Sequence, residues 1–174
     1  KYMNMINDWI VFKLTGKIVS EPSNSSTSGL FDLAKREWLP EVAKKCGLKD
    51  DIFPPVYESG VPVGNVSAEA AHQTGLSEST IVVCGGGDSQ LGCIGVGSIN
   101  PNQAALFGGS FWQYEFNTDK PYVDDRGRIR VNCHSVPSVW QQEAIAWSSG
   151  LVMRWFRDAF LDLDVELAKQ LGTS

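Results

Sequence analysis

The pattern of hydrophobic and polar positions predicts helices separated by short strands and turns. Apolar residues recur at helical spacing over residues 2–14 and again over residues 37–45. A third helix is predicted over residues 68–74, because the Ser67 hydroxyl can cap its first turn and Gly75 can end it. These segments alternate with short apolar runs, an order that is typical of an α/β fold.

The second half of the chain begins with strand-like segments. Residues 103–107 and 111–116 lie on either side of a short glycine turn, which predicts a β-hairpin. Two more strands and two helices are expected after it, the strands over residues 128–133 and 139–146 and the helices over residues 151–160 and 163–171.

Residues 21–27 form a polar segment with no helical period, which follows a predicted short strand at Ile18-Val19. Its sequence is Glu-Pro-Ser-Asn-Ser-Ser-Thr, so it is rich in hydroxyl and amide groups. Such groups either satisfy the backbone of a turn or line a polar ligand pocket. The residues alone leave both interpretations open.

Composition and charge exclude several classes of protein. The chain has 174 residues and a net charge of −5, and its basic residues are scattered, which argues against a nucleic-acid partner. No apolar run approaches the roughly 18 residues of a membrane helix, and no signal peptide is visible. We therefore expect neither a nucleic-acid nor a membrane partner.

The cysteines and histidines give no metal-binding pattern. The four cysteines are far apart, so we expect reduced thiols in a cytoplasmic protein. His72 and His134 are too few and too widely separated for a metal site.

The most distinctive stretch is a glycine-rich segment that follows a β-branched run. Ile81-Val82-Val83 predicts a buried strand, and three glycines and Asp88 come after it. This pattern predicts a strand, a tight glycine turn and a closely packed helix. Asp88 is either the cap of that helix or a catalytic base at the carboxyl end of a strand, where open α/β sheets bind their ligands.

A second glycine cluster, Gly108-Gly109-Ser110, occupies the turn of the predicted hairpin. A glycine turn can present its amides to a phosphate group as an anion-binding nest. A hairpin turn without any ligand is the simpler interpretation. Between the two clusters, the polar turn at residues 99–103 contains a proline and is the predicted domain boundary, which divides the chain into residues 1–98 and 99–174.

Together the two clusters resemble the FGGY carbohydrate kinase family. The resemblance rests on Gly85-Gly86-Gly87-Asp88-x-Gln90-Leu91-Gly92-Cys93 and on Gly108-Gly109-Ser110-Phe111-Trp112-Gln113. Within the family, these residues are most similar to those of members that phosphorylate autoinducer-2. The resemblance implies an actin-like (ribonuclease H-like) ATPase fold, with residues 1–98 ending a first domain and residues 99–174 starting a second.

The resemblance also implies roles for individual residues. Asp88 would deprotonate the sugar hydroxyl, and Asp88, Ser89, Gln90 and Trp112 would contact the substrate. Gly108, Gly109 and Ser110 would lie against the phosphates of ATP, with Mg²⁺ bridging them and reached by Asp88 through a water. The implied cofactors are ATP and Mg²⁺, and the implied partner is a small sugar or polyol-like compound.

Two segments depart from the family pattern. Gly109 stands where the family usually has Thr, so a hydroxyl contact to phosphate would be lost or moved to Ser110. Residues 21–27 resemble an Asp-x-Ser-Asn-Ala-Ser-x-Thr signature, with Glu21 near the place of the acid and Ser25 in place of the Ala. We expect this segment to shape the sugar side of the cleft without a catalytic role.

The resemblance covers nearly all of the chain, but only the middle of a longer kinase. An earlier Asp-x-Gly-Thr phosphate loop and a later Gly-Gly-Gly adenine motif are missing from the sequence. We therefore expect a fragment that joins the end of the first domain to the start of the second, and that is inactive alone. The sequence leaves open whether the protein forms a homodimer.

Two alternatives come from other classes of protein. A non-catalytic sugar-binding or regulatory relative is favoured by Gly109 in place of Thr. A dinucleotide-binding enzyme is disfavoured, because Gly85-Gly86-Gly87 lacks the Gly-x-Gly-x-x-Gly spacing. Among kinases, the substrate stays open between xylulose, gluconate, glycerol, erythritol and the autoinducer-2 compound dihydroxypentanedione.

Overall fold

The computed structural model describes residues 1–173, and of Asp50 the backbone only. The elements of the first part are α1 (Ile6–Thr15), α2 (Pro22–Ser25), η1 (Ser26–Ser28), β1 (Phe31–Asp32), β2 (Glu37–Trp38), α3 (Pro40–Lys45), η2 (Asp50–Ile52), β3 (Pro62–Asn65), α4 (Ala68–Thr74), β4 (Ile81–Val83) and α5 (Asp88–Gly95). Those of the second part are β5 (Ala104–Gly108), β6 (Trp112–Thr118), β7 (Arg130–Cys133), β8 (Trp140–Ala146), α6 (Ser149–Phe160) and α7 (Asp162–Leu171). The mixture of helices and strands confirms the predicted α/β class.

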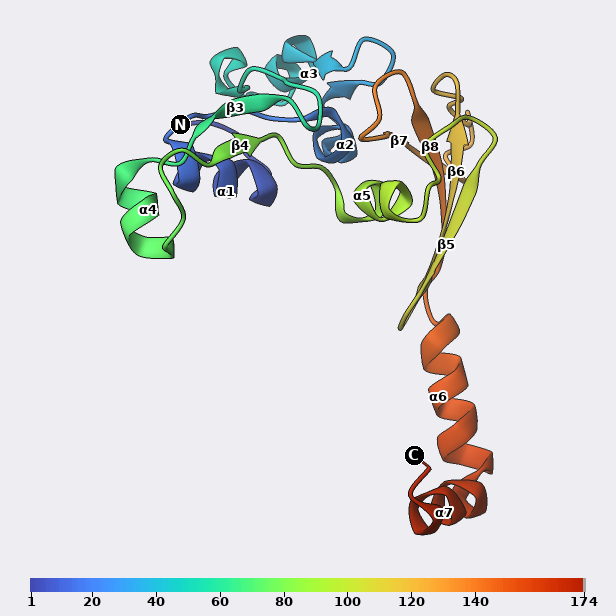
Figure 1. Ribbon diagram of the computed structural model, residues 1–174. Helices are drawn as coiled ribbons and strands as arrows, with labels where there is room; N and C mark the ends of the chain where they lie inside the picture. The colour runs from blue at the N-terminus through green and yellow to red at the C-terminus, as the bar shows by residue number, and fades with distance from the viewer. Residues whose placement is uncertain (174) are drawn as a thin grey trace.

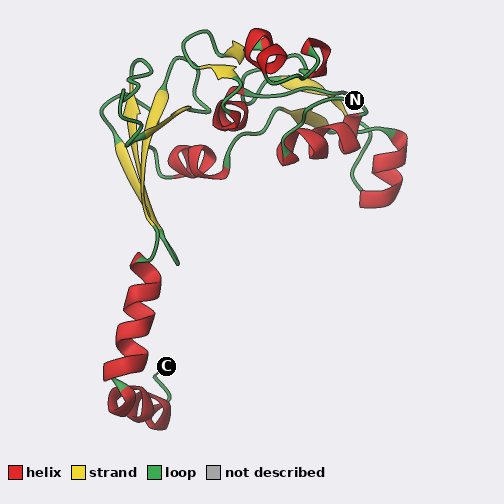
Figure 2. Cartoon of the chain, turned by 180° about the vertical axis from the view of Figure 1, so that it is seen from behind, coloured by secondary structure: helices red, strands yellow, loops and turns green. Residues whose placement is uncertain are grey.

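The chain has an angular shape. The first part forms a body of short elements, the strands β5–β8 stand at one end of it, and α6 and α7 extend away from the sheet as an arm (Figure 1). The view from behind shows the same arrangement, with the C-terminus far from the N-terminus (Figure 2). Helix α5 lies between the body and the sheet, so it connects the two parts.

The four-stranded sheet has the order β5-β6-β8-β7, and all of its neighbouring strands are antiparallel. Since side chains alternate along a strand, Gln113, Glu115 and Asn117 share one face of β6. Gln141 of β8 pairs with Asn117, so its side chain lies on the same face. The Gln141 amide reaches the sulfur of Cys93 in α5 at 3.0 Å, which shows that α5 covers this face. The sheet therefore has an inner face toward α5 and an outer face on the other side.

Two small hydrophobic cores hold the chain together. The first lies where α1 and α4 pack on β3 and β4, and its buried members are Val11, Val19, Val66, Ala70, Val82 and Cys84. The second joins Phe31 to Cys133 and Trp140, so it connects the first part of the chain to β7 and β8. The predicted boundary near residue 98 stays a prediction, and the segments on its two sides share this second core.

Arg36 reinforces the same junction. Its guanidinium pairs with Glu58 at 2.6 Å and donates to the backbone oxygens of His134, at 2.9 Å, and Val139, at 3.2 Å. The Trp140 indole donates to the backbone oxygen of Leu33 at 2.7 Å. Charge-assisted and backbone hydrogen bonds thus fix the sheet against the first part of the chain.

Predictions that depend on a few neighbouring residues, such as helix caps and a hairpin turn, are confirmed. Ser67 caps α4 by accepting a hydrogen bond from the Ala70 amide at 3.2 Å, and Gly75 ends it at φ 78°. The predicted hairpin is formed by β5 and β6, and the two last helices begin within two residues of their expected starts.

Three expectations about the first part are wrong. The helix expected from residue 37 begins at Pro40, whose ring favours the first helical turn, and Glu37–Trp38 instead pairs with β1 as a short strand. Residues 22–28 form α2 and η1 rather than a loop, because the Glu21 side chain caps them. Ile18-Val19 is not a strand, since only Ser20 makes an isolated bridge, to Val56.

The arm formed by α6 and α7 leaves its apolar side chains uncovered. None of the residues of the two helices is buried. Its exposed apolar residues include Trp155, Phe156 and Phe160, and the Phe160 ring contacts the rings of the other two. Among the described residues, no helix is both long and apolar enough to cross a membrane.

Candidate active site

The glycine turn brings the backbone between β4 and α5 into close contact with its neighbours. A Cβ atom on Gly86 would overlap the Ser135 hydroxyl, and one on Gly87 would overlap the Gln90 side-chain oxygen. Close packing therefore favours glycine at both positions, since a larger residue would displace the Ser135 or Gln90 side chain. The two glycines let the chain enter α5 beside the loop that follows β7.

Asp88 is the first residue of α5 and its side chain is exposed. The N-cap residue of α5 is Gly87, so Asp88 is not the cap of this helix. The Asp88 carboxylate accepts a hydrogen bond from the Ser89 amide at 2.8 Å. An acidic side chain in the first turn is stabilised by the helix dipole and stays open to a ligand.

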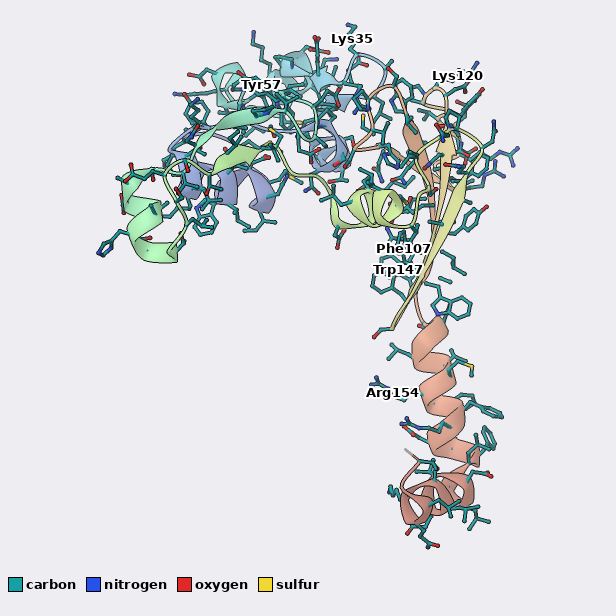
Figure 3. The ribbon with its side chains drawn as sticks, in the orientation of Figure 1. Lys35, Tyr57, Phe107, Lys120, Trp147 and Arg154 are labelled. Atoms are coloured by element: carbon teal, nitrogen blue, oxygen red, sulfur yellow. The ribbon has the colours of Figure 1, made fainter. Side chains whose placement is uncertain are left out.

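A small hollow of about 180 Å³ lies in front of Asp88. Asp88 and Ser89 line it from α5, and Phe107 and Gln113 line it from the β5–β6 hairpin. Phe107 lies so close to α5 that a Cβ on Gly92 would come within 2.9 Å of its ring, and Figure 3 shows Phe107 beside β5 below α5. The site thus combines two residues of α5 with two residues that flank the second glycine cluster on either side.

Gln90 is predicted to touch substrate, but its side chain is only 4% exposed. Its side-chain oxygen accepts a hydrogen bond from the Ser89 hydroxyl at 3.2 Å and lies against Gly87. Gln90 therefore supports the glycine turn and orients Ser89, and it is not among the residues that line the hollow.

The hairpin turn at Gly108, Gly109 and Ser110 is exposed and contacts the start of α6. The Gly109 amide donates to the Phe111 oxygen at 3.0 Å, and the Leu151 amide donates to the Ser110 oxygen at 3.2 Å. The Gly109 amide is thus occupied within the turn. A phosphate contact at this turn stays a prediction.

Trp112 lies on the other face of the hairpin from Gln113, because the two are consecutive residues of β6. Trp112 is 44% exposed, and its indole lies beside Gly108. The structure brings Asp88 and Ser89 together at the hollow and places Trp112 outside it. A role for Trp112 in substrate binding stays a prediction.

The polar segment at residues 21–27 supports the glycine turn from behind. The buried Glu21 carboxylate accepts hydrogen bonds from the amides of Ser23 and Asn24, each at 2.7 Å. The Ser23 hydroxyl in turn accepts a hydrogen bond from the Gly87 amide at 2.8 Å and one from the Ser135 hydroxyl at 3.2 Å. The segment that the sequence leaves between turn and pocket therefore holds the turn that carries Asp88.

Behind the hollow lie two buried carboxylates that the sequence analysis misses. Glu115 and Glu143 face each other across β6 and β8. Burial, together with the charge of Glu143, raises the pKa of Glu115 to about 7, although the hydrogen bond from Gln113 acts against this. Alternation along residues 111–116 could have placed Gln113 and Glu115 on one face, but only the packing of α5 makes that face buried.

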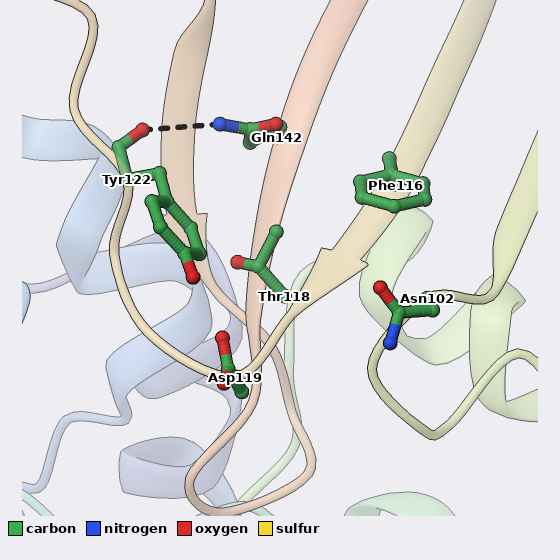
Figure 4. Close-up of a pocket in the computed structure, with 6 residues that line it drawn as sticks. All are labelled: Asn102, Phe116, Thr118, Asp119, Tyr122 and Gln142. Carbon is green, nitrogen blue, oxygen red and sulfur yellow. Dashed lines mark hydrogen bonds between the residues drawn. The ribbon is translucent and has the colours of Figure 1, made fainter.

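A larger hollow of about 480 Å³ lies elsewhere and contains none of the predicted site residues. Thr118 and Phe116 line it, and Gln142 donates a hydrogen bond to the Tyr122 backbone oxygen at its edge (Figure 4). Asn102 and Asp119 complete its lining. Because Phe116 and Gln142 lie on the outer face of the sheet, this hollow is separate from Asp88.

The described residues contain no group of three or more His, Cys, Asp or Glu side chains placed to hold a metal ion. A divalent cation at Asp88 would therefore need further ligands from a bound phosphate or from water.

The four cysteines are free thiols, and burial raises the pKa of Cys133 and of Cys84 to about 11.

Comparison with known proteins identifies the family. The model of the FGGY family of carbohydrate kinases, N-terminal domain, matches residues 1–95, which is more than half of the chain. The chain belongs to the FGGY family of carbohydrate kinases. The resemblance predicted from the two glycine clusters is thereby confirmed.

Curated relatives of this FGGY chain are autoinducer-2 kinases. The autoinducer-2 kinase of Yersinia enterocolitica is 46% identical over 170 residues, which are 98% of this chain and 32% of that enzyme. The autoinducer-2 kinase of Escherichia coli K12 is 45% identical over the same share of both. The FGGY chain thus spans about a third of the length of these relatives.

Solved structures share the fold of this FGGY chain. A structure described as a "xyloylose kinase" from Brucella ovis matches with a TM-score of 0.82 and 25% identity, over 96% of this chain and 34% of that one. Plasmodium falciparum glycerol kinase with ADP matches with a TM-score of 0.82 and 20% identity, over 97% and 34% of the two chains. These matches show the actin-like ATPase fold of FGGY kinases over about a third of its length.

Proposed function

We propose that this chain is the central segment of an ATP-dependent carbohydrate kinase. Residues 1–98 would end its N-terminal domain and residues 99–174 would start its C-terminal domain, with the active site between them. Family membership implies the use of ATP and a small sugar substrate. The observation that carries the proposal is the exposed Asp88 carboxylate, held at the start of α5 in front of a hollow to which both segments contribute.

In the proposed reaction, Asp88 accepts the proton of a substrate hydroxyl while the hydroxyl oxygen attacks the γ-phosphorus of ATP. A bond forms between that oxygen and phosphorus, and the bond from phosphorus to the β-phosphate oxygen breaks, releasing ADP. Phosphoryl transfer of this kind depends mainly on positioning and on charge neutralisation. The rigid glycine turn supplies the positioning, because Ser23 and Ser135 hold it from behind.

The other predicted residues have supporting roles in this proposal. Ser89 lines the hollow beside Asp88 and would contact the substrate, and Gln90 fixes Ser89 from below. Gly108, Gly109 and Ser110 would approach the ATP phosphates. Mg²⁺, when bound, would neutralise phosphate charge, and one exposed carboxylate at Asp88 suits an ion that keeps most of its waters. Domain closure would then exclude water from the transfer.

The proposed substrate is the autoinducer-2 signal, which would give the enzyme a role in quorum sensing. The support is the identity of 46% and 45% to two autoinducer-2 kinases. Xylulose, gluconate and glycerol are the alternatives, since kinases with these substrates share the fold. A cytoplasmic location fits four free cysteines and an ATP-dependent reaction.

A second candidate is a non-catalytic sugar-binding relative. The observation that favours it is Gly109, which offers no hydroxyl to a phosphate and whose amide already donates to Phe111 within the turn. Such a protein would bind ATP without releasing ADP.

The test is a coupled ADP-release assay on the full-length enzyme that contains this chain. The panel is dihydroxypentanedione, xylulose, gluconate, glycerol and erythritol, and ATP binding is measured in parallel. Turnover of dihydroxypentanedione at the highest kcat/KM supports the proposed substrate, and a preference for another member corrects it. ATP binding without ADP release on any compound would favour the non-catalytic relative. The chain of residues 1–174 alone should show no phosphorylation, and detectable transfer by it would contradict its assignment as a partial site.

A further inference from the structure

Gln113 lines the hollow in front of Asp88, and its amide nitrogen is fixed from below. Its Nε2 donates to Glu115 Oε1 at 2.7 Å and to Glu143 Oε1 at 3.0 Å. The neighbouring strands explain this, because Glu115 and Glu143 are directly opposite and Gln113 reaches Glu143 along the diagonal. Both carboxylates are buried, so water does not compete strongly for these hydrogen bonds.

The two hydrogen bonds determine which way the amide of Gln113 is turned. An ionised carboxylate only accepts, and an amide NH₂ group has two hydrogens, so both hydrogens are engaged when Glu115 and Glu143 are ionised. Turning the amide over would place its oxygen against two carboxylate oxygens, which is electrostatically unfavourable. The carbonyl oxygen Oε1 is therefore the polar atom that Gln113 has left, and it makes no hydrogen bond to the described residues.

One of the two carboxylates, Glu143, is itself held in place. Glu143 accepts hydrogen bonds from Asn132 at 3.0 Å and from Arg130 at 3.3 Å through its other oxygen. Polar networks of this kind fix one geometry where their members are paired, and here Glu115 Oε2 and Asn132 Oδ1 are buried without a hydrogen-bond partner among the described residues.

We propose that Gln113 determines substrate specificity by accepting a hydrogen bond, through Oε1, from a substrate hydroxyl next to the one that Asp88 deprotonates. This inference rests on the proposed kinase function and adds a residue to it. A carbonyl oxygen accepts but cannot donate, so the hollow selects a hydroxyl at that position over a carbonyl, carboxylate or phosphate group. Glu115 and Glu143 are positioning residues, since they act through Gln113 and lie outside the hollow.

The test uses the full-length enzyme with the variant Gln113→Leu, which keeps a similar volume and removes the acceptor. For each compound of the panel and its monodeoxy analogues, Kd is measured by calorimetry and kcat/KM by ADP release. The wild type should prefer one hydroxyl over its deoxy analogue on the order of tenfold, the effect of one hydrogen bond. Gln113→Leu should abolish that preference, mainly by weakening the binding of the hydroxylated compound.

Gln142→Leu is the matched control, because Gln142 belongs to the same sheet but lies on its outer face. It should keep the wild-type preference. Thermal unfolding of both variants shows whether they are folded, and Gln113→Met provides a second apolar replacement if Gln113→Leu unfolds.

The outcomes separate this inference from the kinase function. An unchanged preference in both folded Gln113 variants overturns the inference, whatever the turnover. Loss of preference in Kd without any ADP release would support the role of Gln113 and contradict the kinase function. Absence of binding by every compound to the wild type would contradict both.

Discussion

Glu115 and Glu143 lie directly opposite each other on β6 and β8, buried beneath the hollow in front of Asp88. Two like charges in this arrangement repel, and burial disfavours the charged form of each. Consistent with this, the pKa of Glu115 is raised to about 7 from its usual 4.5. The pair therefore couples the stability of the site to pH in the neutral range.

We predict that Glu115→Gln stabilises the protein above pH 7. In the wild type, folding raises the pKa of Glu115, so the folded state binds the proton of this carboxyl more tightly than the unfolded state does. The stabilisation that this proton provides is therefore lost as the pH rises from about 4.5 to about 7. Gln has no proton to lose and keeps an oxygen that can accept from Gln113. The variant should thus gain as much as about 3 kcal/mol over the wild type between pH 5 and pH 8.

The measurement is chemical denaturation of the full-length enzyme and of the variant at several pH values. Only the difference between the two is interpreted, because burial also lowers the pKa of His134, which titrates in an overlapping range with the opposite sign. Glu78→Gln, at an exposed carboxylate, is the control and should show no such pH-dependent difference. If the free energy of unfolding of Glu115→Gln differed from that of the wild type by the same amount at every pH between pH 5 and pH 8, the raised pKa of Glu115 would be contradicted.

Gly86→Ala should destabilise the glycine turn. The added methyl group would overlap the Ser135 hydroxyl, which donates to Ser23 at 3.2 Å. Crowding of this kind costs about 1–3 kcal/mol, and losing the hydroxyl by Ser135→Ala costs about 1 kcal/mol. The double variant should cost less than the sum of the two, because removing the hydroxyl makes room for the methyl group.

This cycle is measured by denaturation of the four proteins, with Gly95→Ala as control. Gly95 lies in α5 with open space around its Cβ position, so alanine there should stabilise by about 0.5–1 kcal/mol. Additive costs for Gly86→Ala and Ser135→Ala would mean that the two positions are not in contact.

Arg36→Ala should loosen the sheet from the first part of the chain. The side chain is mostly buried and donates to Glu58, His134 and Val139, so its loss leaves several acceptors unpaired. We expect a loss of about 2 kcal/mol in the free energy of unfolding. Lysine should not restore it, since its single ammonium group cannot reproduce the planar fork of arginine.

Arg128→Ala is the matched control for Arg36→Ala. Arg128 forms its ion pair with Asp124 on the exposed surface, and exposed pairs contribute little to stability. The Tm of the full-length enzyme should fall clearly for Arg36→Ala and hardly at all for Arg128→Ala. Equal effects would show that the contacts of Arg36 do not hold the two parts together.

Local sequence signals predict the parts of the fold that local interactions determine. Ser67 and Gly75 mark the ends of α4, and the glycines before Asp88 mark a tight turn, because caps and turns depend on a few neighbouring residues. The helix at residues 22–25 was not predictable by period, since it depends on one carboxylate, that of Glu21, which caps it from within a buried network.

In the candidate site too, local motifs are visible in the sequence and contacts between distant segments are not. Asp88 is singled out by its motif and lies exposed at the start of α5, and its catalytic role stays a prediction. Gln113 and Glu115 are not identifiable in this way, because their importance comes from α5, a helix that packs on them and that ends 18 residues before Gln113 in the sequence. The strand alternation that places them on one face does not say which face is covered.

Asp88→Asn should lower kcat of the full-length enzyme by about 10²- to 10⁴-fold, the usual contribution of a general base. The amide keeps the shape and can still accept the Ser89 hydrogen bond, so the fold and ATP binding should be preserved. Asp125→Asn, at an exposed turn far along the chain, is the matched control and should keep full activity. ADP release with saturating ATP measures both variants on the preferred compound of the panel. Turnover close to that of the wild type in Asp88→Asn would remove Asp88 from the mechanism, and the exposed carboxylate would then have to act only through the cation bound with the phosphates.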